Sequence, residues 1–393
     1  MSEDSVVIVS GARTPMGGLQ GCLSAVTAVE LGTTAITAAV ERSGLAPEAI
    51  DEVIMGCVLP AGLKQGPARQ AAIKAGLPNS TGAVTVNKLC GSGMQATIFA
   101  HDQIKAGTAK IILAGGMESM SNAPHVLPSA RGGVGTGNKA MLDHMFLDGL
   151  EDAYTGKMMG SFAQKTADDN NLSRAAMDEF AIESTKRAQA AIENGSLQAE
   201  MVAVTIQSRK GQTIVAEDEQ PGKARLDKIP SLRPAFTKDG TITAANASSI
   251  SDGASALILT SETEAKARGL QPIARIVAHA RNSHEPALFT TAPIGAMQKV
   301  LEKANWSKND VDLWEINEAF AMVTMLAMQG LELDVDKVNV HGGACAQGHP
   351  IGSTGSRIII SLMYALKQYG KQRGVASLCI GGGEALAVAI ELI

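Results

Sequence analysis

Residues 84–96 read VTVNKLCGSGMQA and place a cysteine where a predicted strand turns into a predicted helix. Val84 to Val86 are β-branched, the glycines around Cys90 indicate a turn, and apolar residues from Met94 onward indicate a helix. Free N–H groups and the positive helix end favour an anion there, so we expect a stabilised, nucleophilic thiolate. A free cysteine is more often a buried structural residue. This stretch alone leaves the two interpretations even.

The bulk properties narrow the class of protein. With 393 residues the chain fits two domains or two halves of one fold, and its 45% apolar and 19% charged residues indicate a globular α/β protein. The net charge of −5 argues against nucleic acid as a partner. Five cysteines without CxxC spacing predict a reduced, cytoplasmic protein with no metal site. We expect no signal peptide and no membrane partner, because no apolar run approaches membrane-spanning length.

A weak internal repeat runs through the chain. In each half the sequence predicts, in the same order, a strand, a helix, a strand, a strand-turn-helix unit and a strand ending in glycines. These lie at 6–9, 31–43, 51–55, 84–100 and 109–113, and again at 273–277, 294–304, 312–316, 338–369 and 376–380. Two copies of a βαβ-rich unit predict parallel sheets covered by helices.

The middle of the chain does not follow the repeat, being richer in Gly, Ser, Asn and charge and holding its own predicted helix at 174–194. We therefore predict an N-terminal half at 1–118 that resumes at 249–270, an inserted loop domain at 119–248, and a C-terminal half at 271–393. Positive charge gathers in the inserted segment at Lys223, Arg225, Lys228, Arg233 and Lys238. A solvated loop is the usual interpretation, and a site for a phosphate-bearing ligand is the alternative.

Three further residues stand in settings that favour chemistry. Asn317 lies in 314–321, WEINEAFA, where it caps a helix or takes part in a site. His349 lies in the glycine-rich stretch NVHGGACAQGHPIGSTG (339–355) and is a general-base candidate. Cys379 precedes three glycines whose N–H groups form a plausible oxyanion hole. The other histidines and Cys22, Cys57 and Cys345 are interpreted as structural.

The chain resembles the thiolase family along nearly its whole length, and within it most the acetyl-CoA acetyltransferases. The resemblance rests on four motifs in the right order, a combination that is very specific. They are VNKLCGSG at 86–93, NEAF at 317–320, GHPIG at 348–352 and CIGGG at 379–383. It implies a duplicated five-layered α-β-α-β-α core with a loop domain inserted in the first half.

The resemblance also implies an acyltransferase of fatty acid metabolism, interconverting two acetyl-CoA with acetoacetyl-CoA and CoA without a metal or redox cofactor. Cys90 would carry the acyl group, His349 would take its proton, and Cys379 would move the proton of the α-carbon. Asn317, through a water, and His349 would bind the thioester oxygen of the nucleophile. The N–H groups of Cys90 and Gly381 would hold the acyl-enzyme oxygen.

The resemblance to the family also implies contacts to CoA at a second set of positions. These are Leu150, Met159, Lys228, Ala244, Ser248, Ala319 and Phe320. Two departures concern CoA affinity: Met158 stands where the family often has histidine, and Pro221 stands where some members have arginine, which Lys223 and Arg225 could replace. The segment 119–139 resembles the acetyl-specific branch. In the family a segment like 119–138 carries contacts between dimers, which implies a homotetramer built as a dimer of dimers.

Three rival functions stay open at this point. A degradative 3-ketoacyl-CoA thiolase would use the same residues on longer acyl chains. A Cys-His hydrolase would have no need of Cys379. A non-catalytic CoA-binding protein of the same fold would need none of the four motifs intact.

Overall fold

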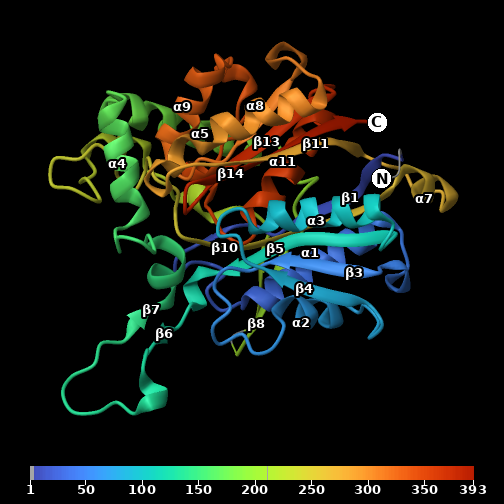
Figure 1. The fold of residues 1–393 in the computed structure, drawn as a ribbon, viewed down its shortest axis with the longest axis horizontal. Coiled ribbons are helices and arrows are strands. Elements are labelled where there is room, and N and C mark those ends of the chain that lie inside the picture. The colour runs from blue at the N-terminus through green and yellow to red at the C-terminus, as the bar shows by residue number, and fades with distance from the viewer. Residues whose placement is uncertain (1–3, 210) are drawn as a thin grey trace.

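The computed structural model describes residues 4–209 and 211–393, which form one large mixed sheet with helices on its faces (Figure 1). The strands lie in the order β12 (Leu313–Ile316), β13 (Arg373–Ile380), β14 (Glu384–Leu392), β11 (Ala274–Ser283), β1 (Val6–Arg13), β10 (Ser251–Ser261), β5 (Ile111–Ser119), β3 (Glu52–Gly56) and β4 (Gly82–Val86). The short β2 (Gly17–Gly18) pairs with β10. β1 and β11 join the first half of the chain to the second, with Val6 opposite Ile276.

The two halves repeat one topology, as the sequence repeat predicts. The order β4-β3-β5-β10-β1 is matched by β12-β13-β14-β11. The counterpart of β4, predicted at 338–340, is reduced to a single bridge between Trp314 and Val338. Asn339 explains why the strand is missing here. Its side chain accepts a hydrogen bond from the Ile316 N–H at 2.8 Å and donates one to the Ile316 carbonyl at 2.8 Å. The side chain thus takes the place of main-chain pairing.

The prediction of parallel sheets is wrong for one strand in each half. β10 runs antiparallel to both β5 and β1, and β14 runs antiparallel to both β13 and β11. Neither strand is predicted from the sequence, because both are rich in serine or alanine, which are poor strand formers. Both are held by long-range pairing on their two edges.

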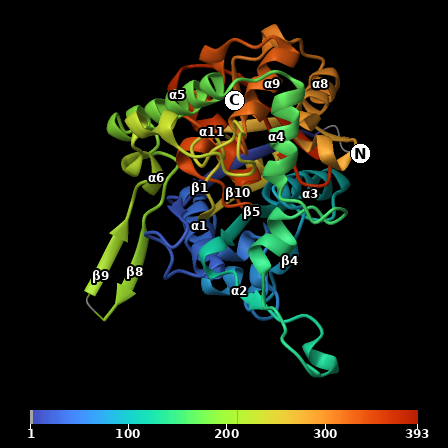
Figure 2. The ribbon, with the colours of Figure 1, turned by 90° about the vertical axis from the view of Figure 1, so that its left-hand side faces the viewer.

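Helices and sheet halves stack in five layers (Figures 1 and 2). The central layer holds α3 (Ser92–Ala106) and α11 (Thr354–Gln368), whose apolar side chains form one core with strands of both halves. α1 (Ala28–Ser43) and α2 (Pro67–Lys74) cover the outer face of the first half, and α8 (Ala292–Ala304) and α9 (Ala321–Leu331) that of the second. The predicted duplicated five-layered core is thus confirmed.

Between β5 and β10 the chain leaves the sheet. This segment carries α4 (Met159–Asp169), α5 (Arg174–Glu193), α6 (Glu219–Lys223), the strand pair β6 (His125–Val126) and β7 (Leu142–Asp143), and the hairpin β8 (Val204–Ser208) with β9 (Gly211–Val215). The β6–β7 arm and the β8–β9 hairpin both extend away from the layered body (Figure 2). Among the described helices, none combines the length and apolar character needed to cross a membrane.

Candidate active site

Cys90 lies in a tight turn between β4 and α3. Leu89 adopts a left-handed backbone conformation with φ of 48°, and Gly91 is the N-cap of α3. The Ser92 hydroxyl fastens the turn by accepting from the Lys88 N–H at 2.8 Å and donating to the Leu89 carbonyl at 2.7 Å. A Cβ at Gly91 would collide with the Ile380 side chain, so glycine lets this turn meet the end of β13. The turn thereby places Cys90 beside residues of the other half.

A cavity of about 450 Å³ brings together most of the predicted catalytic residues, with Cys90, His349, Cys379 and Gly381 all on its wall. Cys90 follows the carboxyl end of β4, and Cys379 lies near the carboxyl end of β13. Ligand sites in α/β folds usually form at these strand ends. A larger groove of about 1000 Å³ runs along α5 and α9, and none of these four residues is among its described lining.

The Cys90 thiol is protonated at neutral pH in this structure. Burial raises its pKa to about 11, although the N–H groups of Gly381 and of Cys90 itself act to lower it. The negative charge of Glu118 adds to the increase. The expected stabilised thiolate is therefore wrong for the unliganded protein, because burial outweighs the helix end and the two donors. The thiol needs a base when it reacts.

His349 has the tautomer that such a base requires. Its Nδ1 lies 2.7 Å from the hydroxyl oxygen of Thr354, and that hydroxyl donates to the Pro350 carbonyl at 3.0 Å. With the hydroxyl proton directed at Pro350, the Thr354 oxygen accepts from Nδ1–H, and the lone pair on Nε2 then faces the Asn317 amide nitrogen at 3.5 Å. Burial, together with the positive charge of Arg357, lowers the pKa of His349 to about 3. The imidazole is neutral and able to accept a proton.

A buried carboxylate holds the loop that carries His349. Glu118 lies at the end of β5 and accepts from the N–H groups of Val58, Leu59 and Gly352 at 2.9, 3.1 and 2.9 Å. It thus joins the first half of the chain to the GHPIG loop of the second. Neither Glu118 nor Thr354 is predicted from the sequence as a site residue. The strand-Gly-Gly-Met-Glu pattern that ends the first repeat was the available signal.

Asn317 lies behind His349 rather than on the cavity wall. Its amide nitrogen is 3.5 Å from His349 Nε2, and its amide oxygen is buried without a hydrogen-bond partner among the described residues. The helix-capping alternative is wrong, because the N-cap of α9 is Phe320. A buried amide oxygen without a partner is costly unless a water or a ligand satisfies it.

Cys379 is buried, at 1% exposure, in a core cluster with Phe289, Ala319 and Phe320. Burial raises the pKa of its thiol well above the usual value, and the nearby Cys90 adds to the increase. The chain then turns through Gly381 to Gly383. Gly383 has φ of 86°, and a Cβ there would strike the backbone carbonyl of His284. Glycine is required at this turn.

The predicted CoA contacts divide into two groups. Six of the seven line the cavity, namely Leu150, Met159, Ala244, Ser248, Ala319 and Phe320. Met158 lines it too. The sequence analysis did not single out several other lining residues, among them Met120, Phe146, Phe236, Phe289 and Ile351. These apolar residues come from separate elements, so no local pattern marks them as one wall.

The remaining predicted CoA contact, Lys228, lies outside this cavity and is exposed. Its ammonium is 3.7 Å from the Asp227 carboxylate. Its basic neighbours are also paired: Arg225 lies 3.4 Å from the same Asp227, and Lys223 forms an ion pair with Glu219. Pro221 is buried in α6. The basic segment is thus a solvated surface whose charges are partly neutralised.

Comparison with known proteins identifies the family that shares this architecture. Residues 6–263 match the family model of the thiolase N-terminal domain, and residues 270–392 match that of the thiolase C-terminal domain. An acetyl-CoA acetyltransferase of Cupriavidus necator is 47% identical over 388 residues, covering 98% of this chain and 99% of that one. One of Rhizobium meliloti is 48% identical over 392 residues, covering 100% of both chains.

Two solved structures share the fold. The crystal structure of the Bacillus anthracis acetyl-CoA acetyltransferase superposes with a TM-score of 0.97 at 40% identity, covering 99% of both chains. A thiolase of Ascaris suum, solved in complex with coenzyme A, superposes with a TM-score of 0.94 at 41% identity, covering 99% of this chain and 100% of that one. From the two matched domains and the full-length relatives, this chain belongs to the thiolase family.

Proposed function

We propose that this protein is an acetyl-CoA C-acetyltransferase, which interconverts two acetyl-CoA with acetoacetyl-CoA and CoA. The observation that carries the proposal is the shared cavity of Cys90, His349, Cys379 and the Gly381 N–H. A neutral base, two thiols and a backbone donor supply a nucleophile, a proton acceptor, a second acid–base group and oxyanion stabilisation. The names of the full-length relatives point to the same activity.

In the first half-reaction His349 Nε2 takes the proton of the Cys90 thiol as the sulfur attacks the thioester carbonyl of acetyl-CoA. Because the pKa of the thiol is raised to about 11, this transfer accompanies the attack. The N–H groups of Cys90 and Gly381 hold the negative oxygen. The CoA sulfur leaves with the proton of the Cys379 thiol, and the acetyl group stays on Cys90.

In the second half-reaction the Cys379 thiolate takes a proton from the α-carbon of a second acetyl-CoA. The resulting carbanion attacks the acetyl carbonyl on Cys90, forms the new carbon–carbon bond and expels the Cys90 sulfur. That sulfur recovers its proton from His349. Asn317, through a water bound to its unpartnered oxygen, and His349 stabilise the enolate oxygen. Every proton is returned, and the C–C and S–H bonds that form replace a C–H and a C–S bond, so the cycle balances with no net oxidation or reduction.

For the assembled enzyme we propose a cytoplasmic homotetramer, a dimer of dimers. The β6–β7 arm supports it, because Leu127, Val134, Met141 and Leu142 are exposed there although they are apolar. The five cysteines are unpaired, as a reducing compartment would keep them. Sedimentation at micromolar concentration tests the assembly, and a monomer would contradict it.

The function is tested by locating the acetyl group. After incubation with acetyl-CoA, quenching and peptide mass mapping, we expect the acetyl group on Cys90. The Cys379→Ser variant should still acquire it, more slowly because the CoA sulfur loses the Cys379 proton, and should lose condensation, whereas a Cys-His hydrolase would stay active without Cys379. Acetyl on Cys379, or loss of acylation in the variant, would overturn the division of roles.

A further inference from the structure

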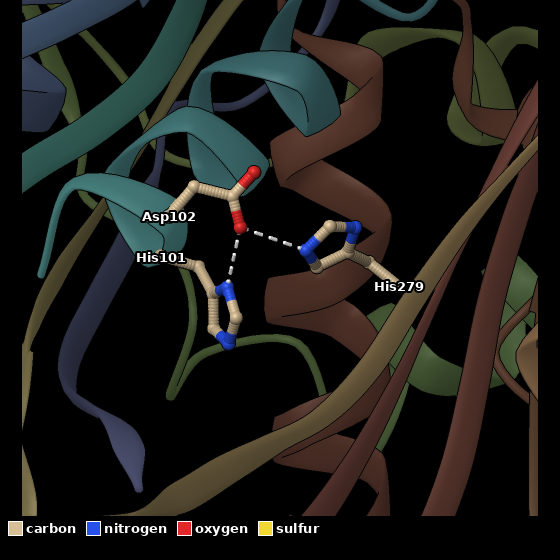
Figure 3. A group of neighbouring side chains, drawn as sticks. All are labelled: His101, Asp102 and His279. Atoms are coloured by element: carbon tan, nitrogen blue, oxygen red, sulfur yellow. Dashed lines mark hydrogen bonds and ion pairs between the residues drawn. The ribbon is translucent and has the colours of Figure 1, made fainter. Parts of the chain in front are cut away.

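Three metal-ligating side chains meet outside the active site. His101 and Asp102 lie on α3, and His279 lies on β11 (Figure 3). One oxygen of Asp102 is 2.9 Å from His101 Nδ1 and 3.0 Å from His279 Nε2. The two imidazole rings meet edge to face, with centroids 5.0 Å apart. From the sequence both histidines are predicted to be structural residues, and the fold brings His279 to Asp102 across 177 positions of the chain.

The fold brings these side chains together at the seam between the two halves. α3 belongs to the first half, and β11 is the first strand of the second. On β11, Ala278 and Ala280 face the core under α8, so strand alternation turns His279 toward the opposite face and α3. The side chains of His101, His279 and Asp102 are 13%, 23% and 54% exposed. Solvent therefore reaches a cluster whose histidines are largely enclosed.

The donor set is suited to a borderline divalent transition metal. One ligand atom from each residue can be chosen so that all three lie within 4.8 Å of one another. Tetrahedral zinc with bonds of about 2.0–2.1 Å needs ligand atoms about 3.3 Å apart. The two contacts of 2.9 and 3.0 Å therefore have to open by a few tenths of an ångström, and the two histidine ligand atoms, which lie within 4.8 Å of each other, have to come to about the same separation. The more exposed Asp102 can supply that movement by rotating its carboxylate.

The surroundings are compatible with a cation. Lys105 lies one turn further along α3, where its ammonium donates to the Asp4 carbonyl at 2.7 Å, and its positive charge opposes a cation at His101. Lys303 donates to the backbone carbonyl of His279 at 3.0 Å, which helps to fix the position of β11. The Asp102 carboxylate supplies a negative charge directly to the cluster. Two neutral imidazoles and one carboxylate are typical zinc ligands.

We propose that His101, Asp102 and His279 form a three-ligand site for Zn²⁺ or a chemically similar divalent metal such as Co²⁺, with water in the remaining position. The bound metal bridges α3 to β11 and so links the two halves of the chain. The site lies apart from the catalytic cavity and needs no part of the proposed acyl transfer. Its effect is on stability, because a ligand that binds only the folded state raises the unfolding temperature.

The test uses the full-length protein after treatment with EDTA. Calorimetric titration with Zn²⁺ should give one site per chain, and Zn²⁺ but not Mg²⁺ should raise the unfolding temperature. His279→Gln and Asp102→Asn should each weaken binding at least about 100-fold, since even outer-shell partners cost 10–100-fold. The matched control is His125→Gln, which removes an exposed histidine on β6 and should leave binding unchanged.

Thiols also bind zinc, so a second measurement distinguishes metal bound at this cluster from metal bound by the cysteines. With Co²⁺, the cluster should give a visible spectrum without thiolate charge transfer, and alkylation of Cys90 should not change it. Circular dichroism checks that the variants are folded. Binding of equal strength in His279→Gln and the unmodified chain, binding lost on alkylation, or no stoichiometric binding at micromolar Zn²⁺ would each overturn the proposal.

Discussion

The Thr354 hydroxyl accepts from His349 Nδ1 at 2.7 Å while donating to the carbonyl of Pro350. A residue outside the catalytic set thus fixes the histidine tautomer. We predict that Thr354→Val lowers the rate of acylation about ten- to hundred-fold, because the buried Nδ1–H loses its acceptor at a cost of ~1–3 kcal/mol. Single-turnover acylation by acetyl-CoA measures the effect.

Thr354→Ser is the matched control, since it keeps the hydroxyl and should keep most of the rate. Circular dichroism separates a loss of fold from a loss of tautomer. If the valine and serine variants acylate equally fast, the hydroxyl does not position His349.

A second prediction concerns Asn317, whose amide oxygen is buried without a partner among the described residues. Asn317→Ala should acylate at close to the normal rate and condense at least tenfold more slowly, because its main loss is the water that binds the enolate oxygen, whereas the 3.5 Å contact of its amide nitrogen with His349 Nε2 is a weak one. Burst acylation and steady-state condensation give the two rates. Equal loss in both steps would make Asn317 a structural residue.

The raised pKa of Cys90 and the lowered pKa of His349 predict a pH profile. Between about pH 6 and pH 9 the imidazole is neutral, since its pKa is about 3, and the thiol is protonated, since its pKa is about 11. The thiolate fraction therefore rises roughly tenfold with each pH unit. Alkylation of Cys90 by iodoacetamide, followed by mass mapping, should rise in proportion. A rate that is already flat at neutral pH would indicate a preformed thiolate–imidazolium pair.

Acyl chain length tests the role of the methionines on the cavity wall. Met159 packs next to Gly381, with its sulfur 3.3 Å from the place that a Cβ would occupy. We expect acetoacetyl-CoA to be thiolysed with a far higher kcat/KM than 3-ketodecanoyl-CoA, because each unburied methylene forfeits roughly 0.8 kcal/mol. Met159→Ala should raise the relative kcat/KM for 3-ketohexanoyl-CoA. Met328→Ala, on α9 and outside the cavity lining, is the matched control.

The opposite order of substrates would contradict acetyl specificity. A flexible methionine that yields to longer acyl groups would make the ten-carbon substrate the best one. The enzyme would then be a degradative 3-ketoacyl-CoA thiolase.

Local sequence patterns predicted much of the core. The β-branched run at 84–86 lies within β4, and the helix predicted at 31–43 lies within α1. What they could not reveal is β14, EALAVAIEL, whose alanines favour no strand and whose two neighbours come from distant parts of the chain. Strand direction in the sheet was misjudged for the same reason.

The active-site residues also fall into those that the sequence reveals and those that it does not. Cys90, His349 and Cys379 stand out because each adjoins glycines that mark a turn, and the structure places all three on one cavity. Glu118 and Thr354 do not stand out, because they act through hydrogen bonds to backbone groups and a ring nitrogen that only folding brings near. The state of the Cys90 thiol was also mispredicted, since burial is a property of the whole fold.

The seam between β1 and β11 has a consequence for synthesis of the protein on the ribosome. Cys90 belongs to the half that emerges first, whereas His349 and Cys379 lie near the end of the chain. A nascent chain that has folded only its first half holds the sulfur but neither its base nor the Gly381 donor. The complete set of catalytic groups is therefore assembled only when the last strands have joined the sheet.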